Sequence, residues 1–268
     1  MTLAEKFERL KKILLDMESV AVAFSGGVDS TFLLKVAHDT LGEKSLALTA
    51  DSVFIPRLEI NYAKNFCAAE KIRHLIIKTD VLADDAIAAN PPERCYICKR
   101  ALFKNFLAAA KQNGCKFVAE GSNVDDTNDF RPGRKALAEL DVKSPLLSAE
   151  LTKDEIRELS RNFFLPTADK PSMACLATRF TFGDRLTAKR LAMVEAAENF
   201  LRDIGIGQLR VRVHGNLARI EIEPKDFQTL LAVRDDVAKK FRALGFEFVA
   251  MDLQGYRVGS MNVGGQRR

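Results

Sequence analysis

The sequence lacks any apolar run long enough to cross a membrane. Its longest runs, such as Val20–Phe24 and Leu75–Ile77, have the length of a β-strand, whereas a membrane-spanning helix needs about 20 consecutive apolar residues. The first ten residues mix acidic and basic side chains and contain no apolar segment typical of a secretory signal. The sequence therefore predicts a cytoplasmic protein without a membrane segment.

The net charge is also small, and the chain has few cysteines and histidines. Forty-one Lys and Arg residues stand against 36 Asp and Glu residues. The net charge of +5 suits an anionic small molecule but falls short of what a nucleic-acid-binding protein usually carries. The five cysteines, in a chain without a secretory signal, are expected to be reduced thiols that serve packing, metal binding or catalysis.

What the first 120 residues do contain is a regular alternation of predicted strands and helices. Short apolar runs predict strands at 20–24, 46–50, 74–78 and 116–120, and helical spacing predicts helices at 3–17, 31–41, 57–71 and 96–112. This alternation indicates βαβ units and therefore an α/β, Rossmann-like domain, in which helices cover both faces of a parallel sheet. Ligands bind such sheets beyond the carboxyl ends of the strands.

The pattern changes near residue 180. Helices are predicted at 187–203 and 225–244, and strands at 209–214, 218–222 and 246–253. These elements predict a small α+β domain in which Val211, Val213, Ile220 and Ile222 face inward and arginines lie opposite. We therefore predict one domain of residues 1–180 and a smaller domain of residues 181–268, which would bind substrate or form an oligomer interface.

The most informative segment is Ser25-Gly-Gly-Val-Asp-Ser30, between a predicted strand and a predicted helix. Two glycines let the backbone approach a ligand closely, and successive amides before a helix can bind an anion. The two serines add hydroxyl donors, and Asp29 could hold Mg²⁺ on phosphates. A Gly-Gly turn alone is common, but the complete pattern favours phosphate binding. It is not a Walker A loop, because no Gly-Lys-Ser/Thr follows.

This hexapeptide resembles the PP-loop of the N-type ATP pyrophosphatases, such as the NAD and GMP synthetases, argininosuccinate synthetase and tRNA-thiolating enzymes. The resemblance implies that ATP is cut between its α- and β-phosphates and that AMP is left on the acceptor. It assigns the nucleotide and its Mg²⁺ to Ser25, Gly26, Gly27, Asp29 and Ser30.

Two further segments match these enzymes more weakly. Asp51 and Ser52 would lie near the adenine or the ribose. Gly121, followed by Ser122-Asn123 and the pair Asp125-Asp126, would form a second loop of the site, although these two acids could equally belong to a solvated loop.

Three of the cysteines suggest a role beyond packing. Cys95 and Cys98 are three residues apart at the start of a predicted helix, which places both sulfurs on one side of a turn, and Cys175 is a third candidate. Cys67 and Cys115 lie in apolar segments and are expected to be buried. Ordinary helix cysteines, a structural zinc site and a dithiol pair remain possible, but no histidine is an obvious fourth zinc ligand. A [4Fe-4S] cluster held by three thiolates is favoured, because one iron would stay open for a sulfur species.

Several motifs together resemble the LarE-type sulfur transferases over nearly the whole chain. They are Ser25–Ser30, Asp129-Phe-Arg-Pro-Gly-Arg-Lys135, Cys175 followed by Thr178-Arg179-Phe180, Val211-Arg-Val-His214 and Gly255-Tyr-Arg257. The family implies that carboxylates of a pyridinium biscarboxylic acid mononucleotide are adenylated and converted to thiocarboxylates, on the way to the nickel-pincer nucleotide cofactor. It also suggests a homo-oligomer, supplied by sulfide or a sulfur-donor protein.

The cysteines divide this family into two branches. In one branch, the cysteine at the position of Cys175 gives up its own sulfur and becomes dehydroalanine. The additional Cys95 and Cys98 resemble the cluster-bearing branch, in which sulfide could be replaced and turnover become catalytic. Cys175 and Asp29 are thus the predicted catalytic residues, and Cys95, Cys98 and Cys175 the predicted cluster ligands.

Five arginines are candidates for binding the acceptor. Arg210, Arg212 and Arg257 could receive its phosphate, because guanidinium groups match phosphate oxygens in geometry, although a solvated strand face would also explain them. Arg131 and Arg179 lie inside the matched motifs. Glu221 could orient one of these arginines.

Two other activities are compatible with a PP-loop. tRNA thiolation also combines this loop with three cysteines, but the chain has neither zinc-ribbon cysteine pairs nor a strong basic patch with aromatic residues. An ammonia-using ligase would leave the three cysteines idle. Dependence on sulfide or on ammonia would separate these alternatives.

Overall fold

The computed structural model describes residues 1–128, 132–171, 173–257 and 259–261 of the 268-residue chain. Contacts within the chain define two compact units, residues 1–79 with 95–173 and residues 80–94 with 174–268. The division predicted from the sequence, at residues 180 and 181, stays a prediction. None of the helices in the described part of the chain is long and apolar enough to span a membrane.

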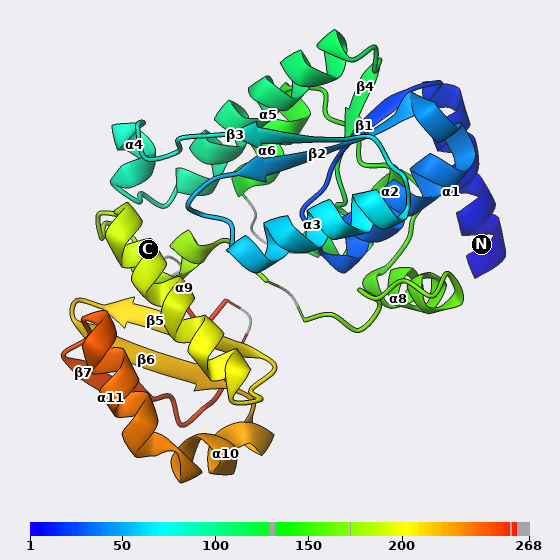
Figure 1. The fold of residues 1–268 in the computed structure, drawn as a ribbon. Coiled ribbons are helices and arrows are strands. Elements are labelled where there is room, and N and C mark those ends of the chain that lie inside the picture. Colours follow the sequence, from blue (N-terminus) through cyan, green and yellow to red (C-terminus); the bar gives the residue numbers. More distant parts are fainter. Residues whose placement is uncertain (129–131, 172, 258, 262–268) are drawn as a thin grey trace. The chain divides into compact units, whose positions relative to one another are not determined.

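The first unit is built on a four-stranded parallel sheet (Figure 1), which confirms the predicted α/β class. Its strands are β1 (Val20–Ala23), β2 (Ser45–Asp51), β3 (His74–Lys78) and β4 (Phe117–Ala119), in the order β3-β2-β1-β4. Val20 of β1 lies opposite Ser45 of β2 and Phe117 of β4. Since β2 and β3 lie on one side of β1 and β4 on the other, the crevice between β1 and β4 is where such a sheet binds ligands.

Helices cover both faces of this sheet (Figure 1). They are α1 (Leu3–Met17), α2 (Val28–Leu41), α3 (Arg57–Ala69), α5 (Arg94–Gln112), α6 (Pro132–Glu139), α7 (Pro145–Ser148) and α8 (Lys153–Asn162), with short 3₁₀ helices η1 (Gly42–Lys44) and η2 (Val124–Asn128). Helix α2 begins three residues earlier than predicted, because Gly27 is extended and its carbonyl accepts hydrogen bonds from the backbone N–H and the hydroxyl of Thr31. Asp29 and Ser30 therefore lie in the first turn of α2.

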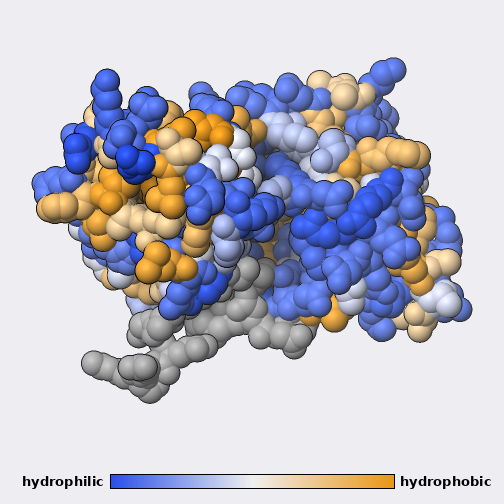
Figure 2. Space-filling model, turned by 90° about the horizontal axis from the view of Figure 1, so that it is seen from below, coloured by the Kyte–Doolittle hydropathy of each residue, from blue (hydrophilic) through white to orange (hydrophobic). Residues whose placement is uncertain are grey.

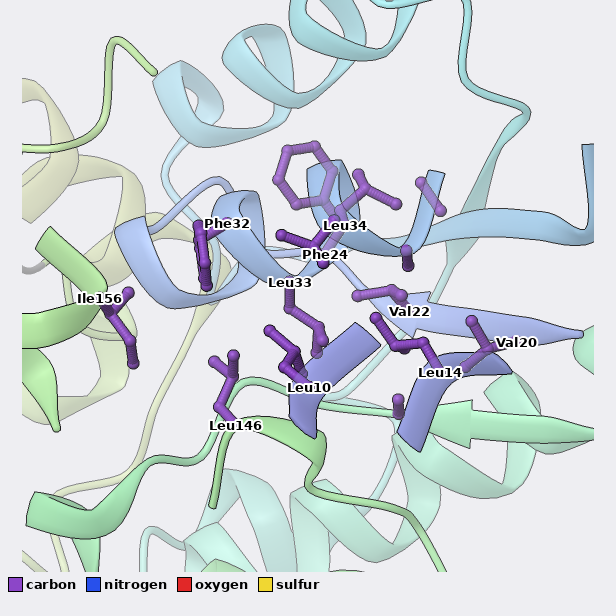
Figure 3. Close-up of a cluster of buried hydrophobic side chains, with 14 of the residues drawn as sticks. Leu10, Leu14, Val20, Val22, Phe24, Phe32, Leu33, Leu34, Leu146 and Ile156 are labelled. Atoms are coloured by element: carbon purple, nitrogen blue, oxygen red, sulfur yellow. The ribbon is translucent and has the colours of Figure 1, made fainter. Parts of the chain in front are cut away.

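Alternate residues of the buried strands feed two apolar clusters. Val20, Val22 and Phe24 pack with α1, α2, α7 and α8, and Figure 3 shows Leu10, Leu14, Leu33, Leu146 and Ile156 gathered around them. Ala21, Leu46 and Leu48 pack on the other face with Phe103 and Phe106 of α5. Burial on both sides of the central strands fixes the position of the loop that follows β1.

The second unit has a three-stranded sheet in the order β5-β6-β7 (Figure 1), and it is the predicted small α+β domain. Its elements are α4 (Asp85–Ala88), η3 (Leu176–Arg179), α9 (Ala188–Asp203), β5 (Leu209–His214), β6 (Leu217–Ile222), η4 (Pro224–Asp226), α10 (Phe227–Ala232), α11 (Arg234–Leu244) and β7 (Phe248–Met251). Strands β5 and β6 are antiparallel, whereas β6 and β7 are parallel. Val211, Val213, Ile220 and Ile222 are buried as predicted.

Two details of the second unit differ from the prediction. The single helix expected at 225–244 is divided at Val233, which leaves the helical conformation, and Asp235 and Asp236 stabilise the first turn of the next helix. Arg210 and Arg212 were expected opposite the buried face, yet only 3% and 5% of their surfaces are exposed, so both faces of β5 are covered.

Apolar side chains also remain on the surface. Figure 2 shows one face of the molecule, on which hydrophilic residues dominate the right-hand part and apolar residues gather toward the left. In the second unit, Leu231, Phe248 and Leu253 are exposed, and Phe248 lies on the edge strand β7. Exposed apolar residues on an edge strand are a common feature of protein interfaces.

Candidate active site

The loop after β1 is held in shape by its own serines. The backbone N–H of Ser25 donates to Ser30 Oγ at 3.3 Å, the two hydroxyl oxygens are 3.1 Å apart, and Ser30 Oγ donates to the carbonyl of Gly27 at 3.1 Å. Gly27 caps α2 without a side chain, so no side-chain oxygen of the cap competes with an anion for the first N–H groups of the helix. Gly26 has φ +76, and a Cβ there would lie 2.9 Å from Glu59 Oε2. The geometry is that of an anion-binding turn that requires glycine.

A pocket of about 160 Å³ opens beside this loop. It carries three cationic side chains and two carboxylates, all from the first unit. The lining residues are Ser25, Gly27, Val28, Asp29, Glu59, Lys153, Arg157, Lys170, Pro171 and Met173. Serine hydroxyls, a helix N-terminus and several cations around one pocket are the features that bind phosphate groups.

Both carboxylate oxygens of Asp29 have a partner in this pocket. Oδ2 lies 2.5 Å from Lys153 Nζ, and Oδ1 accepts from Asn123 Nδ2 at 3.2 Å. Lys153 is the first residue of α8, so two helix N-termini carry charged side chains that meet at this point. Asp29 thus lies at the pocket with its carboxylate oriented, while its binding of Mg²⁺ stays a prediction.

The loop after β4 approaches the loop after β1 closely. A Cβ at Gly121 would lie 3.1 Å from both Asp29 Cβ and the backbone nitrogen of Ser30. Beyond it, Asp126 Oδ2 accepts from the N–H of Asn123, and Asp125 Oδ2 accepts from the N–H of Lys153 at the start of α8. Asp125 and Asp126 therefore hold the loop and the helix start that carry Asn123 and Lys153.

We expect Gly121→Ala to slow the predicted cleavage of ATP to AMP and pyrophosphate roughly tenfold, because Asp29 and Ser30 must move by a few tenths of an ångström to accept the methyl group. Initial rates of ATP-dependent pyrophosphate release would measure the loss. Gly207→Ala is the matched control, since a Cβ there meets nothing within 4 Å. Equal rates for the two variants would contradict a close approach of functional importance.

Asp51 is the last residue of β2 and Ser52 follows it, at the same edge of the sheet as the loop after β1. Asp51 Oδ1 is 2.5 Å from Arg57 Nη1, and Arg57 Nη2 donates to the carbonyl of Ser52 at 2.6 Å. Ser52 Oγ accepts from the N–H of Phe54. Arg57 therefore fixes this turn, while the contact of Asp51 and Ser52 with a nucleotide stays a prediction.

Sequence reasoning missed three cations of the pocket. Lys170 Nζ donates to Glu59 Oε2 at 2.8 Å and to the carbonyl of Gly26 at 2.9 Å, and it lies over the ring of Tyr62. Arg157 donates to the carbonyls of Ala168 and Lys170. Only Lys153 could have been suspected from the sequence. A lysine in the first turn of a helix opposes the helix dipole and is therefore unusual.

The cysteines differ in environment as predicted. Burial raises the pKa of the Cys67 thiol to about 12 and also raises that of Cys115, so both are unreactive packing residues. Cys95 and Cys98 are half-buried at the start of α5 in the first unit, and Cys175 is half-buried directly before η3 in the second. Within the described ranges, no group of three or more His, Cys, Asp or Glu side chains is placed to hold a metal ion.

Arg179 is fully buried and binds the loop that carries Cys175. Its Nε and Nη2 donate to the two carboxylate oxygens of Glu198 at 2.8 and 3.0 Å. Its Nη1 donates to the carbonyls of Ala174 at 2.7 Å and Cys175 at 3.1 Å. Arg179 thus fixes the backbone at Cys175. Its place in a matched motif did not indicate this role.

The other predicted arginines have different surroundings. Arg212 Nε donates to the buried Glu221, its Nη1 to the carbonyl of Thr178, and its Nη2 to Ser260 Oγ. Arg210 lies over the ring of Tyr256, and burial together with Arg179 lowers the pKa of its guanidinium to about 10. Arg257 is exposed, and Arg131 lies outside the described residues. Glu221 thus neutralises Arg212, and a contact of these arginines with an anionic acceptor stays a prediction.

We expect Glu198→Gln to destabilise the second unit by about 3–5 kcal/mol at pH 7, because Arg179 and Arg202 lose a buried counter-charge. Burial alone would raise the pKa of Glu198, but Arg179, Arg202 and Arg210 hold it below its usual 4.5. The stabilisation is therefore present above pH 4.5 and is lost as pH falls through the lowered pKa.

Hydrogen–deuterium exchange of β5 in the full chain would compare wild type with Glu198→Gln. The variant should exchange much faster than wild type at neutral pH, and this difference should shrink in acid. Glu223→Gln, which removes the exposed contact with Lys225, should leave exchange unchanged at both pH values. Equal exchange in wild type and Glu198→Gln at pH 7 would contradict the role of this carboxylate.

No protein-family model matches the chain. It is 37% identical over 264 residues to the pyridinium-3,5-bisthiocarboxylic acid mononucleotide synthase of Lactiplantibacillus plantarum, with 97% of this chain and 95% of that protein covered. An uncharacterised protein of Synechocystis sp. is 38% identical, with coverage of 97% and 98%. Argininosuccinate synthase of Natronomonas pharaonis is 28% identical over 56% of this chain and 40% of that enzyme. The first two similarities extend over both units of the structure.

Proposed function

The chain belongs to the LarE-type family of ATP-dependent sulfur transferases, and we propose that its acceptor is a pyridinium biscarboxylic acid mononucleotide. The acceptor's carboxylates would become thiocarboxylates, as required for the nickel-pincer nucleotide cofactor. This proposal rests on the relative from Lactiplantibacillus, whose name gives the bisthiocarboxylic product, and on its coverage of both units. Each exchange would consume one ATP and release AMP and pyrophosphate.

The observation that supports the first half-reaction best is the pocket beside Ser25–Ser30. A carboxylate oxygen is a poor leaving group, so it must first be joined to AMP. The acceptor carboxylate attacks the α-phosphorus, and the bond to the oxygen that bridges to the β-phosphorus breaks. The hydroxyls of Ser25 and Ser30, the start of α2 and the cations of the pocket would bind the phosphates and stabilise the departing pyrophosphate.

Mg²⁺ fits the donors at this pocket. The carboxylate of Asp29 and the hydroxyl of Ser25 offer oxygen ligands, and Mg²⁺ commonly uses only one or two carboxylates together with phosphate oxygens and water. We propose that Asp29 holds the ion. When bound, it would neutralise negative charge on the phosphates.

For the second half-reaction we propose that Cys95, Cys98 and Cys175 hold a [4Fe-4S] cluster. Their donor chemistry fits, because all three are half-buried thiols outside any disulfide, and two of them are three residues apart on α5. The cluster, when bound, would supply sulfur from sulfide or from a sulfur-donor protein.

The second unit would bind the acceptor. We propose that Arg210, Arg212 and Arg257 receive its phosphate, whereas Arg179 would act by holding the backbone at Cys175. Arg131 is proposed for the same acceptor on its motif alone. We also propose a homo-oligomer, supported by the exposed Phe248 and Leu253 in and beside the edge strand β7, and no nucleic-acid partner.

An anaerobic assay with ATP, Mg²⁺, sulfide and the biscarboxylic acid mononucleotide tests the function. The expected result is equal amounts of AMP and pyrophosphate and a product in which sulfur has replaced carboxylate oxygen, seen by mass spectrometry. Ammonia in place of sulfide and unmodified tRNA in place of the mononucleotide are the controls. Product formed only with ammonia or only with tRNA would overturn the proposal.

A further inference from the structure

We propose that Lys153 is a catalytic residue. When nucleotide and metal occupy the pocket, its ammonium group leaves the carboxylate of Asp29 and contacts the leaving pyrophosphate. The inference rests on the proposed adenylation at this site and adds a group that carries no sequence motif. Lys153 Nζ contacts Asp29 Oδ2 at 2.5 Å, and both side chains line the pocket with Ser25 and Gly27.

The three cations of the pocket are held in different ways. Lys170 is bound by Glu59 and by the carbonyl of Gly26, and Arg157 by the carbonyls of Ala168 and Lys170. These contacts would persist when Mg²⁺ enters, since none involves the carboxylate that the ion needs. The contact of Lys153 is with that carboxylate itself. An ion bound to Asp29 would therefore release Lys153 and leave the other two cations in place.

Lys153 combines a fixed backbone with a charged end that is partly exposed. It is the first residue of α8, where a positive charge is unfavourable because it faces the positive end of the helix dipole. Its backbone N–H is held by Asp125 Oδ2 at 2.6 Å, so the start of the stem is fixed while 34% of the side chain remains exposed. A fixed origin and a flexible stem allow the ammonium to move from Asp29 to a phosphate oxygen within the same pocket.

The chemical step needs this charge at a defined moment. As the bond from the α-phosphorus to the bridging oxygen breaks, the electron pair stays on the leaving pyrophosphate. Lys153 remains protonated throughout and donates to that oxygen or to its β-phosphate neighbours. Because the negative charge on the leaving group grows toward the transition state, the contact should accelerate release more than it tightens ATP binding.

The test is pyrophosphate binding to the full chain in Mg²⁺, by isothermal titration calorimetry, without ATP or acceptor. Lys153→Met should bind pyrophosphate at least about tenfold more weakly than wild type. Lys153→Arg, which keeps the charge, should stay within about threefold. Lys6→Met is the matched control, because Lys6 also forms an ion pair with the first turn of α8, through Glu155, but does not line the pocket. It should bind as wild type.

Kinetics separate a catalytic role from a structural one. With acceptor present, Lys153→Met should lower the rate of pyrophosphate release at saturating ATP at least about 100-fold, while the KM for ATP changes less than about fivefold. Should Lys153→Met fail to fold, Lys153→Gln gives the same comparison. Wild-type affinity for pyrophosphate in the folded variant, or an equal loss in Lys6→Met, would overturn the proposal.

The two proposals can fail separately. A wild-type protein that does not consume ATP with the mononucleotide would remove the proposed acceptor, yet the calorimetric comparison would still decide the role of Lys153. Wild-type protein that binds no pyrophosphate at all would overturn the assignment of Lys153, because the pocket would then not be the leaving-group site.

Discussion

Asp29→Asn is expected to abolish acceptor-dependent pyrophosphate release, with a loss on the order of 10²–10³-fold or more. Asparagine keeps the size of the side chain and can still contact Asn123 and Lys153, so the loop after β1 should keep its shape. What disappears is the negative charge that would hold Mg²⁺ against the phosphates. Initial rates measured across a Mg²⁺ titration would show the loss at every concentration of the ion.

Asp39→Asn is the control for this variant. Asp39 also lies on α2 and also pairs with a lysine, Lys35, at 2.8 Å, but it faces solvent away from the pocket. We expect its pyrophosphate release to match that of the wild type. Full release by Asp29→Asn would remove Asp29 from the mechanism and would leave the Lys153 contact as an ordinary ion pair.

The architecture of the first unit could be predicted from local patterns. Apolar runs of strand length alternate with helical spacing, and only a parallel sheet with helices on both faces buries all of them. The carboxyl edge of that sheet then placed Ser25–Ser30 and Gly121 close together before any contact was known. The Cβ distances at Gly121 confirm this. The early start of α2 was missed because a glycine cap carries no side-chain signal.

The cations of the pocket could not be predicted in the same way. Lys153 and Lys170 are 124 and 144 residues away from Asp29 and Gly26, the residues that they contact. Neither lysine belongs to a motif, and each would pass as a surface residue of a polar helix or loop. The packing of α8 against α2 brings Lys153 to the phosphate-binding loop, and Lys170 reaches it from the segment that follows α8. Contacts of such long range are a property of the tertiary structure.

The arginines of β5 show where strand alternation misleads. Alternation indicates one buried and one solvated face, so Arg210 and Arg212 were expected at the surface. In the structure Glu221 pairs with Arg212, and Glu198 of α9 pairs with Arg179 and Arg202, which allows a charged layer to be buried. A buried charge requires such partners. The sequence suggested that Glu221 could orient an arginine, but it gave no sign that Glu198 pairs with Arg179 and Arg202.

Cys175→Ala is expected to eliminate sulfur transfer while acceptor-dependent pyrophosphate release stays within about threefold of the wild type, for a single turnover. The two half-reactions separate because the pocket beside Ser25–Ser30 lies wholly in the first unit, whereas Cys175 lies in the second. Thiolated product and pyrophosphate would be quantified in the same reaction. Cys115→Ala, which alters a buried thiol with a raised pKa, is the control and should keep both activities.

Iron content and Cys95→Ala then decide how the sulfur is delivered. If three thiolates hold a cluster, anaerobic reconstitution of the wild type should give about four irons per chain, and Cys95→Ala, Cys98→Ala and Cys175→Ala should each lose the iron and repeated turnover. If Cys175 instead surrenders its own sulfur, mass spectrometry would find dehydroalanine at residue 175 after one turnover, and Cys95→Ala would behave as wild type. A Cys95→Ala variant with full iron and sulfide would defeat the three-ligand model, because Cys98 and Cys175 alone would then suffice.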